Sequence, residues 1–320
     1  MPTEEQKAGA WAVLFPGQGS QENNMGRDIA EFDSEVMRLW EKTEKAVGER
    51  VREIYWDGDE EAMSETRYLQ PALTATALGI WMSFPFRSYP DYLAGHSVGE
   101  YVALAAAGVL NPEEVIDLVA LRARLMSEAG EQESGKMAVA LKMDQESVEA
   151  IVDEARTQTD GVLCLANYNT PQQFVLSGSV QSVDAAAALV KERRGRAQSL
   201  PVSGAFHSPL MDEAAKELAG YMDKLQWSSA RIPVHMNVNA RPETRGESIK
   251  ELIKWQIVSP VLWSQIILDQ WDRGVRKWLE FGPKGVLVRM LPSILGKQSP
   301  WKAEHIDSRD KLNHSEGILA

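Results

Sequence analysis

Ser97 is the residue whose surroundings most clearly suggest chemistry, because it lies in the segment Gly95-His96-Ser97-Val98-Gly99-Glu100. A short apolar run (residues 92–94) precedes this segment, and an alanine-rich run (residues 101–107) follows it. A strand, the pattern Gly-x-Ser-x-Gly and a helix are typical of a nucleophile elbow, a sharp turn that exposes a serine hydroxyl. The helix would begin at Val98 and direct free N–H groups at an oxyanion formed on Ser97. The motif alone fits equally well with a glycine-bounded turn that holds an incidental serine.

A nucleophilic serine needs a base with a pKa near neutrality, and His207 is the candidate. It lies in a loop between a predicted strand and a predicted helix, and it follows the serine in the chain, as in α/β hydrolases. A lone loop histidine is more often a surface or capping residue. The other histidines lie in the elbow, in an apolar strand and in a polar C-terminal stretch: His96, His235, His305 and His314. No two histidines have metal-ligand spacing, so we expect no metal site.

Arg122 is the third candidate, because it lies within the apolar stripe of a predicted helix. That helix begins at Asn111-Pro112-Glu113-Glu114, where a capping side chain, a proline and two acids mark a helix start. A guanidinium stays ionised and is costly to bury without an anion, so a core-facing arginine implies a partner carboxylate. The partner is either a structural carboxylate of the protein or the carboxylate of a substrate bound in a bidentate pair.

A glycine-rich loop, Pro16-Gly17-Gln18-Gly19-Ser20-Gln21, follows a predicted buried strand at residues 11–15. It has neither the Gly-Lys-Ser/Thr ending nor the G-x-G-x-x-G spacing of nucleotide sites, so we do not expect a nucleotide there. The carboxyl end of a strand is where α/β sheets place their active sites. The backbone N–H groups of this loop are therefore candidates to complete an oxyanion hole with that of Val98.

The elements that must position these residues follow the order of an α/β protein. From residue 136 the chain reads as a strand (136–143), a helix (144–157), two strands (162–166 and 174–177), a helix (180–194) and a strand (197–202). This βαββαβ order is that of the ferredoxin-like split unit. We therefore predict an α/β-hydrolase-like large domain with a parallel central sheet (residues 1–134 and 203–297) and an inserted ferredoxin-like small domain (residues 135–202).

The remaining segments supply the scaffold of the large domain. We expect helices at residues 26–47, 69–81, 260–271 and 284–295, and strands at residues 232–238 and 275–281. Residues 298–320 are polar and show no periodic pattern, so we interpret them as a surface-bound or disordered tail.

The composition argues against several classes of protein. A formal net charge of −12 argues against nucleic-acid binding, which needs a basic surface. A single cysteine, Cys164, excludes an internal disulfide framework and fits a reducing compartment. The charged first residues lack the apolar run of a signal peptide, and no segment has the ~18 apolar residues of a membrane span. We expect a cytoplasmic protein that does not bind membranes.

A basic cluster stands out in this acidic chain. Lys191, Arg193, Arg194 and Arg196 lie at the end of the second helix of the small domain. Cations at a helix C-terminus complement the helix dipole, which explains the cluster without any partner. The alternative is that the cluster docks an acidic partner protein.

With the elbow, the Gln18 loop, Arg122 and His207 taken together, the sequence resembles the malonyl-CoA:acyl carrier protein transacylase family. The resemblance runs from Phe15 to about Leu291, in separate blocks that occur in the family's order. Besides the Gln18 loop, the elbow and Arg122, these blocks are Gln70-Pro71-Ala72-Leu73, Ala205-Phe206-His207-Ser208-Pro209-Leu210-Met211, Asn237-Val238-Asn239-Ala240, Gln256-Ile257-Val258-Ser259-Pro260-Val261 and Glu280-Phe281-Gly282-Pro283.

The resemblance implies a role for each candidate of the reaction centre. Ser97 would be the acylated nucleophile and His207 its general base. The backbone N–H groups of Gln18 and Val98 would form the oxyanion hole. In this family a backbone carbonyl, here that of Gln256, orients the histidine in place of an aspartate.

The resemblance also implies how the substrate is bound. Arg122 would bind the free carboxylate of the malonyl group, with Gln18 and His96 also in the substrate site. Phe206 matches a pattern that accompanies malonyl rather than methylmalonyl selection in related domains, because a bulky ring crowds an α-methyl group.

The implied reaction is transfer of malonyl from malonyl-CoA to the phosphopantetheine thiol of an acyl carrier protein, in a ping-pong mechanism without a cofactor. We expect a monomer. Two alternatives stay open at this point. One is a hydrolase that clears acyl groups from carrier proteins, which Arg122 argues against, and the other is a scaffold that only binds carrier proteins.

Overall fold

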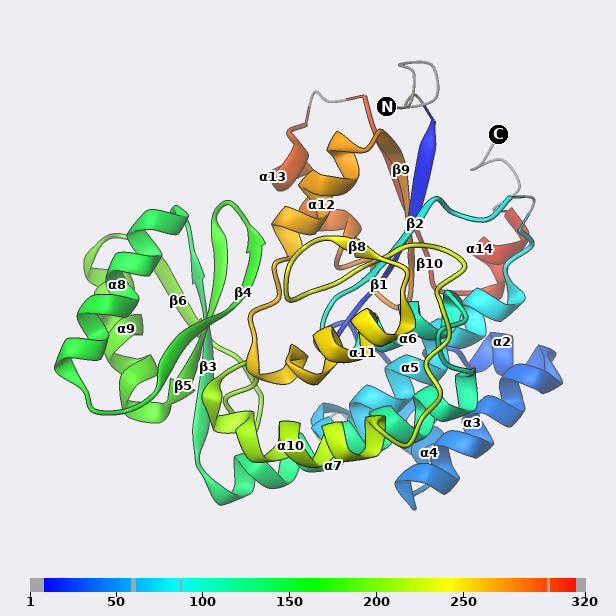
Figure 1. Cartoon of the computed structure of the whole chain (residues 1–320), viewed down its shortest axis with the longest axis horizontal. Helices are drawn as coiled ribbons and strands as arrows, with labels where there is room; N and C mark the ends of the chain where they lie inside the picture. Colours follow the sequence, from blue (N-terminus) through cyan, green and yellow to red (C-terminus); the bar gives the residue numbers. More distant parts are fainter. Residues whose placement is uncertain (1–8, 59–61, 87, 298–299, 315–320) are drawn as a thin grey trace.

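The computed structural model describes residues 9–58, 62–86, 88–297 and 300–314. These residues form two β-sheets with helices packed around them (Figure 1). A six-stranded sheet lies in the larger part of the molecule, and a four-stranded antiparallel sheet lies beside it, at the left of Figure 1. The described chain is therefore mixed α/β, as the sequence predicted.

The larger sheet has the strand order β10-β9-β1-β2-β7-β8. The five strands from β10 to β7 pair in parallel, and β8 pairs antiparallel with β7. β1 lies inside the sheet with helices over both of its faces, which explains its continuous apolar sequence. The strands are β1 (Ala10–Phe15), β2 (Tyr92–Gly95), β7 (Val234–His235), β8 (Pro242–Glu243), β9 (Val275–Phe281) and β10 (Lys302–Ile306).

The helices around this sheet are α2 (Arg27–Phe32), α3 (Ser34–Val47), α4 (Val51–Trp56), α5 (Thr66–Ser83), α6 (Gly99–Ala106), α7 (Pro112–Gln132), α10 (Asp212–Met222), α11 (Gly246–Lys254), α12 (Trp263–Asp272), α13 (Leu291–Leu295) and α14 (Arg309–His314). α7 begins at the predicted cap, where Asn111 and Glu114 form a reciprocal capping box. The helix expected over residues 26–47 is two helices, because Asp33 leaves the helical conformation and caps α3. Within the described ranges, no helix is both long enough and apolar enough to cross a lipid bilayer.

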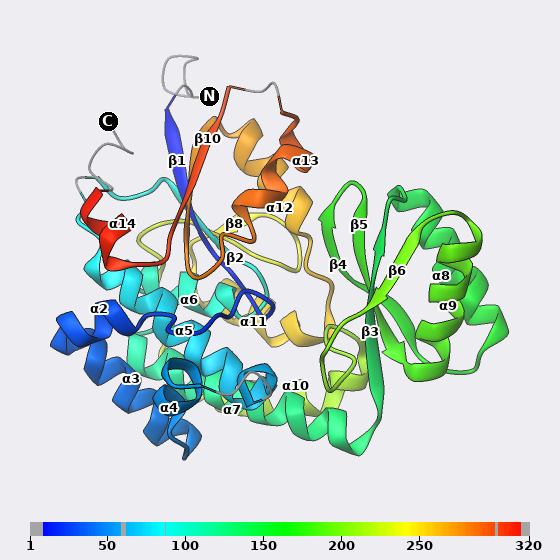
Figure 2. The same ribbon diagram turned by 180° about the vertical axis from the view of Figure 1, so that it is seen from behind.

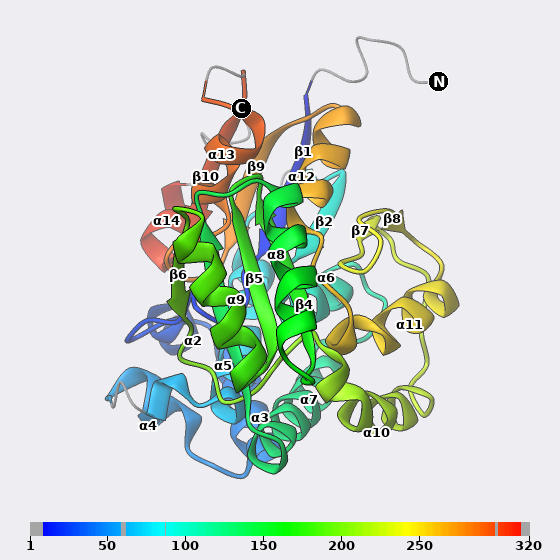
Figure 3. The ribbon, with the colours of Figure 1, turned by 90° about the vertical axis from the view of Figure 1, so that its left-hand side faces the viewer.

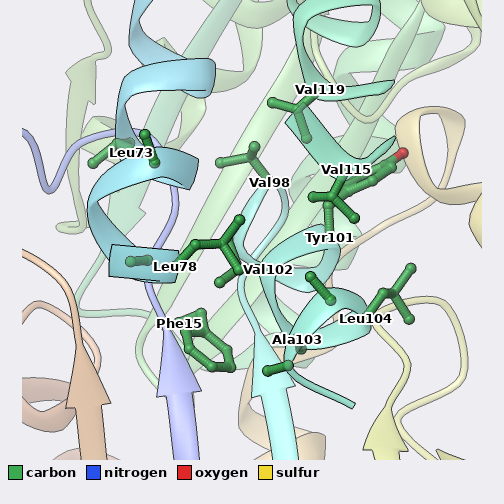
Figure 4. Close-up of a cluster of buried hydrophobic side chains, with 14 of the residues drawn as sticks. Phe15, Leu73, Leu78, Val98, Tyr101, Val102, Ala103, Leu104, Val115 and Val119 are labelled. Atoms are coloured by element: carbon green, nitrogen blue, oxygen red, sulfur yellow. The ribbon is translucent and has the colours of Figure 1, made fainter. Parts of the chain in front are cut away.

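β1 divides the core into two clusters, because its successive side chains point to opposite faces of the sheet. Val13 and Phe15 pack in the cluster that includes α5 and α6, whereas Ala12 and Leu14 pack with α12 and α13. Figure 4 shows the first cluster, where side chains of α5 and α6 surround Phe15. The elbow helix α6 is thus fixed by apolar contacts along its whole length.

The smaller sheet consists of β3 (Gly135–Leu141), β4 (Leu163–Thr170), β5 (Gln173–Ser179) and β6 (Arg196–Ser199) in the order β4-β5-β3-β6. Helices α8 (Gln145–Gln158) and α9 (Val180–Glu192) cover one face, which is turned toward the viewer in Figure 3. Alternation along β3 explains this layering, because Ala138 and Ala140 pack under the helices whereas Met137 and Val139 join the core of the larger part. The chain order is β3-α8-β4-β5-α9-β6.

Several elements are shorter than their sequence patterns predicted. The strand expected at residues 232–238 is only β7, because the chain turns after Met236 through a hydrogen bond from Ala240 N to Met236 O. The helix expected at residues 284–295 is a 3-10 turn (Val288–Met290) followed by α13. The strand expected at residues 197–202 ends at Ser199, and the helix expected from residue 260 begins at Trp263.

The interpretation of residues 298–320 as a surface-bound or disordered tail missed the regular structure of residues 302–314. Residues Lys302–Ile306 form β10, which pairs in parallel with β9 along the edge of the larger sheet, and α14 follows it (Figure 2). An edge strand has one free side and needs few apolar residues, so its polar sequence gave no strand signal. Residues 298–299 and 315–320 of the expected tail, and residues 1–8, lie outside the described residues.

Candidate active site

Ser97 lies on a sharp turn between β2 and α6, as the elbow motif predicted. Its backbone φ is +52°, in the left-handed region that side chains rarely adopt. The flanking glycines are required for close packing. A Cβ on Gly95 would lie 1.9 Å from the carbonyl carbon of Gly99, and one on Gly99 would lie 2.1 Å from Phe15 O. The motif therefore encodes the turn itself.

His207 is the base candidate that the structure brings to Ser97. Its Nε2 lies 2.7 Å from Ser97 Oγ. Its Nδ1 lies 3.0 Å from both Gln256 O and Ser259 O. Carbonyl oxygens only accept hydrogen bonds, so the proton is on Nδ1 and the lone pair of Nε2 faces the hydroxyl. Two carbonyls thus fix the tautomer that a general base needs.

The protonation state of His207 follows from its surroundings. Burial, and then the positive charge of Arg122, lower the pKa of His207 to about 3. The imidazole is therefore neutral at physiological pH and able to take a proton from the serine.

Arg122 projects from α7 toward the same hydroxyl and is completely buried. Its Nη2 donates to Ser97 Oγ and to Gln256 Oε1, both at 3.1 Å, and its Nη1 donates to Gln70 Oε1 at 2.5 Å. The guanidinium also lies 5.3 Å from the centre of the Tyr101 ring. Within the described residues Arg122 has no carboxylate in ion-pair contact, so its observed hydrogen-bond acceptors are neutral. This environment favours an external carboxylate as its anionic partner.

The backbone N–H groups of Gln18 and Val98 are the expected oxyanion donors. Within the described ranges neither N–H donates a hydrogen bond to a protein atom. The Gln18 loop is pressed against the elbow, because a Cβ on Gly17 would lie 2.6 Å from His96 O. The side chain of Gln18 is anchored through its Nε2, which donates to Thr66 Oγ1 at 3.2 Å.

Two further candidates border this centre. His96 Nε2 lies 2.8 Å from Asn169 Oδ1 of β4, so this contact joins the elbow to the smaller sheet, and burial lowers the pKa of His96. Phe206 is buried beside His207 in the chain, and its backbone oxygen accepts a hydrogen bond from Ser177 Oγ at 2.7 Å.

The basic cluster lies apart from these groups, on the smaller sheet and its helices. Lys191, Arg193, Arg194 and Arg196 are all exposed where α9 ends and β6 begins. Arg193 is paired with Glu154 of α8, so its charge is partly satisfied inside the protein.

Sequence reasoning assigned no role to three polar residues that hold this centre together. Gln70 binds Arg122, and its signal was a polar side chain within a buried apolar helix. Asn237 binds the elbow backbone, with Oδ1 accepting from Ser97 N at 2.8 Å and Nδ2 donating to Gly95 O at 2.7 Å. Glu100 accepts from the backbone of Asn237 and from Gln256. The contacts of Asn237 and of Glu100 join residues more than 130 positions apart, which no local sequence pattern predicts.

Ser97 is hydrogen-bonded to a neutral histidine and lies 3.1 Å from a buried cation, and two backbone N–H groups of the elbow and the Gln18 loop have no acceptor among the described residues. Acyl transfer through a serine ester requires such a set of groups. The fold and the site thus define an acyl transferase. The family model described as "Acyl transferase domain" matches residues 12–313.

Known relatives carry a more specific description. The malonyl CoA-acyl carrier protein transacylase of Bacillus subtilis (strain 168) is 36% identical over 285 residues, which cover 88% of this chain and 90% of the relative. The crystal structure of an acyl carrier protein S-malonyltransferase from Vibrio cholerae superposes with a TM-score of 0.88 at 33% identity, covering 96% of this chain and 99% of that one.

A further solved structure is that of a malonyl-transacylase in complex with the holo form of a type II PKS acyl-carrier protein. It superposes with a TM-score of 0.90 at 31% identity and covers 97% of this chain and 99% of that chain. The present chain belongs to the acyl transferase family and, within it, to the malonyl CoA-acyl carrier protein transacylases. The family resemblance inferred from the sequence is confirmed.

Proposed function

We propose that this protein transfers the malonyl group of malonyl-CoA to the phosphopantetheine thiol of an acyl carrier protein, through a malonyl ester on Ser97. The names of its relatives and the carrier-protein complex of one of them support this assignment. The observation that carries it is the buried guanidinium of Arg122, 3.1 Å from Ser97 Oγ and with neutral protein acceptors. A carboxylate on the acyl group would supply an anion in direct contact with this guanidinium.

The first half-reaction forms the malonyl ester. Ser97 Oγ attacks the thioester carbon while His207 Nε2 takes the hydroxyl proton, and the N–H groups of Gln18 and Val98 bind the oxyanion. The tetrahedral adduct then collapses, the C–S bond breaks, and His207 returns the proton to the CoA thiolate. The enzyme is left as the malonyl ester of Ser97.

The second half-reaction runs the same steps in reverse with a different thiol. His207 takes the proton of the phosphopantetheine thiol, whose sulfur attacks the ester carbon. The same two N–H groups bind the oxyanion, and Ser97 leaves with the proton from His207. Gln256 O and Ser259 O hold the imidazole in one orientation throughout both halves.

Arg122 both selects the acyl group and protects the ester. A guanidinium binds a carboxylate with charge-assisted hydrogen bonds in a defined orientation. The fixed acyl group leaves one direction of approach to the ester carbon, which favours a bound thiol over water. In the same proposal Gln18 and His96 contact the substrate, and Phe206 restricts the α-carbon to an unsubstituted malonyl group.

We propose that the carrier protein docks partly on the basic cluster. Lys191 and the three arginines form an exposed cationic surface, which would attract an acidic partner protein. We place the protein in the cytoplasm as a monomer that needs no cofactor.

We also propose a fold type for each of the two domains. A parallel sheet with a nucleophile elbow supports an α/β-hydrolase-like large domain, expected at residues 1–134 and 203–297 and extended here by β10 and α14 at residues 302–314. The βαββαβ order and the strand order β4-β5-β3-β6 support a ferredoxin-like small domain at residues 135–202.

One incubation tests the proposed function. The protein is mixed with malonyl-CoA labelled in the malonyl group and with holo acyl carrier protein, and label is counted on enzyme, carrier and free malonate. We expect label on the enzyme without carrier and on the carrier once it is added. Label mainly in free malonate identifies a hydrolase, and no label on either protein identifies a binding scaffold.

A further inference from the structure

Glu100 is a buried carboxyl group to which the proposed reaction assigns no role. It lies in the first turn of α6, three residues after Ser97, and its side chain is fully buried. Its Oε1 accepts a hydrogen bond from the backbone N–H of Asn237 (2.8 Å), and its Oε2 accepts one from Gln256 Nε2 (2.6 Å). The donors lie 137 and 156 positions away in the sequence, so Glu100 joins the elbow to two distant segments.

Gln256, one of these two partners, contacts the proposed nucleophile, the proposed base and the cation beside them. Its backbone oxygen accepts from His207 Nδ1, and its Oε1 accepts from Arg122 Nη2. Its Nε2 donates to Glu100 and also to Ser97 O at 2.8 Å. An amide nitrogen has two N–H bonds, so both of these hydrogen bonds form together. Displacement of this one residue, backbone and side chain together, would disturb nucleophile, base and cation at once.

Asn237, the second partner, holds the strained turn. Its N–H is bound to Glu100, while its side chain accepts from Ser97 N and donates to Gly95 O. These bonds satisfy backbone groups on both sides of the turn in which Ser97 has a positive φ. Such a conformation persists only where its surroundings determine it.

We propose that Glu100 is a positioning residue for acyl transfer, which as a carboxylate holds Gln256 and Asn237 and through them fixes the His207 imidazole and the Ser97 backbone. It does not touch the reacting atoms. The site thus contains an acid, but that acid acts on the histidine through Gln256 and not by direct contact. This inference rests on the proposed transfer reaction.

The pattern of donors explains why this position requires a carboxylate. Both partners of Glu100 present N–H groups, so two acceptor oxygens are needed. A glutamine has nearly the same shape, but its own N–H would face the N–H of Gln256 or of Asn237 and leave a buried donor unpaired. The negative charge also offsets the buried charge of Arg122, with the Gln256 amide between the two and oriented by both.

Glu280 on β9 provides a matched control. It is also fully buried, its Oε2 accepts from Val288 N at 2.8 Å, and burial raises its pKa to about 7, as it does for Glu100. In the described part of the chain, no hydrogen bond joins Glu280 to the groups around Ser97. Glu280→Gln therefore removes a buried carboxylate without removing the bonds that hold Gln256.

The test compares full-length wild type, Glu100→Gln, Glu100→Asp and Glu280→Gln. For each, kcat and KM for malonyl-CoA and for carrier protein are measured together with the thermal unfolding midpoint. We expect Glu100→Gln to lower kcat about a hundredfold, because small displacements of catalytic groups have effects of this size. KM for malonyl-CoA stays within about threefold, because Arg122 is still present to bind the carboxylate.

The conservative variant and the control complete the design. Glu100→Asp keeps the charge with a shorter reach, so its kcat is expected to lie at least tenfold above that of Glu100→Gln and below wild type. Glu280→Gln is expected to change the unfolding midpoint while kcat stays within about twofold of wild type.

Two outcomes overturn the inference. One is a folded Glu100→Gln protein with wild-type kcat, and the other is an equal loss of kcat in Glu100→Gln and Glu280→Gln. If Glu100→Gln does not fold, Glu100→Asp decides, because wild-type kcat in that variant also overturns the inference. An inactive wild type would instead contradict the proposed function.

Discussion

Ser97 and His207 have backbone φ angles of +52° and +57°, and their side chains are joined by a 2.7 Å hydrogen bond. A residue other than glycine in the left-handed region costs on the order of 1–3 kcal/mol, so both ends of this bond lie on strained backbone. The packing around them must hold that strain. The core contacts of α6, the close approach of Gly95 to Gly99 and the bonds from Asn237 serve this purpose.

Removing the cation beside the serine should change which acyl groups are transferred. Arg122→Ala is expected to lower kcat/KM for malonyl-CoA about a hundredfold, because charge-assisted hydrogen bonds to a carboxylate contribute roughly 3 kcal/mol. Acetyl-CoA has no carboxylate to bind, so transfer of acetyl should fall much less. Both reactions are measured by label on the carrier protein, and equal losses would show that Arg122 does not bind the malonyl carboxylate.

The pH dependence of kcat/KM should report Glu100 and not the catalytic base. The pKa of His207 is lowered to about 3, so this imidazole stays neutral at pH 5 and above. Burial raises the pKa of Glu100 to about 7, against hydrogen bonds from Gln256 and Asn237 and the charge of Arg122, which lower it. As pH falls through about 7 the carboxylate takes a proton, and we expect kcat/KM to fall with it.

Other charged or titratable groups near Glu100 do not titrate in this range. Arg122 remains charged, and burial raises the pKa of Tyr101 to about 12, so the phenol remains neutral. The check is the profile of Glu100→Gln, which should be low but flat from pH 5.5 to 8.5. A fall near pH 7 of the same size in that variant would assign the titration to another group.

Reversal of charge in the basic cluster should act on carrier protein alone. Arg194→Glu combined with Arg196→Glu leaves the pair between Arg193 and Glu154 intact. We expect KM for carrier protein to rise about tenfold at low salt while KM for malonyl-CoA is unchanged, because rim charges steer association. The control reverses two exposed cations elsewhere, Lys45 and Lys224, so that it too breaks no ion pair found among the described residues. Unchanged carrier kinetics would leave the cluster with its helix-terminal role.

Local sequence signals predicted those parts of the fold that local interactions determine. The boundaries of β9 matched the strand predicted at residues 275–281, and α7 began at its predicted cap. β10 was missed because its sequence is polar and shows no strand pattern. It is a strand because it pairs with β9. β7 was predicted too long because the chain leaves the sheet to bring Asn237 to the elbow.

The site divides in the same way. The elbow glycines, the loop histidine and the inward-facing arginine can each be recognised in the sequence. In the structure both His207 and Arg122 lie within hydrogen-bonding distance of Ser97 Oγ. The polar residues that hold them could not be assigned. Glu100, for example, has a role only through its hydrogen bonds to Asn237 and Gln256, which lie 137 and 156 positions away in the sequence.

The most direct test of the account is the intact mass of the protein after brief incubation with malonyl-CoA in the absence of carrier protein. Wild type should gain the mass of one malonyl group, and that mass should be lost when holo carrier protein is added. Ser97→Ala should gain nothing, with an unchanged unfolding midpoint to show that it is folded. A malonyl adduct that survives in Ser97→Ala would contradict the account, because the ester would then form on another residue.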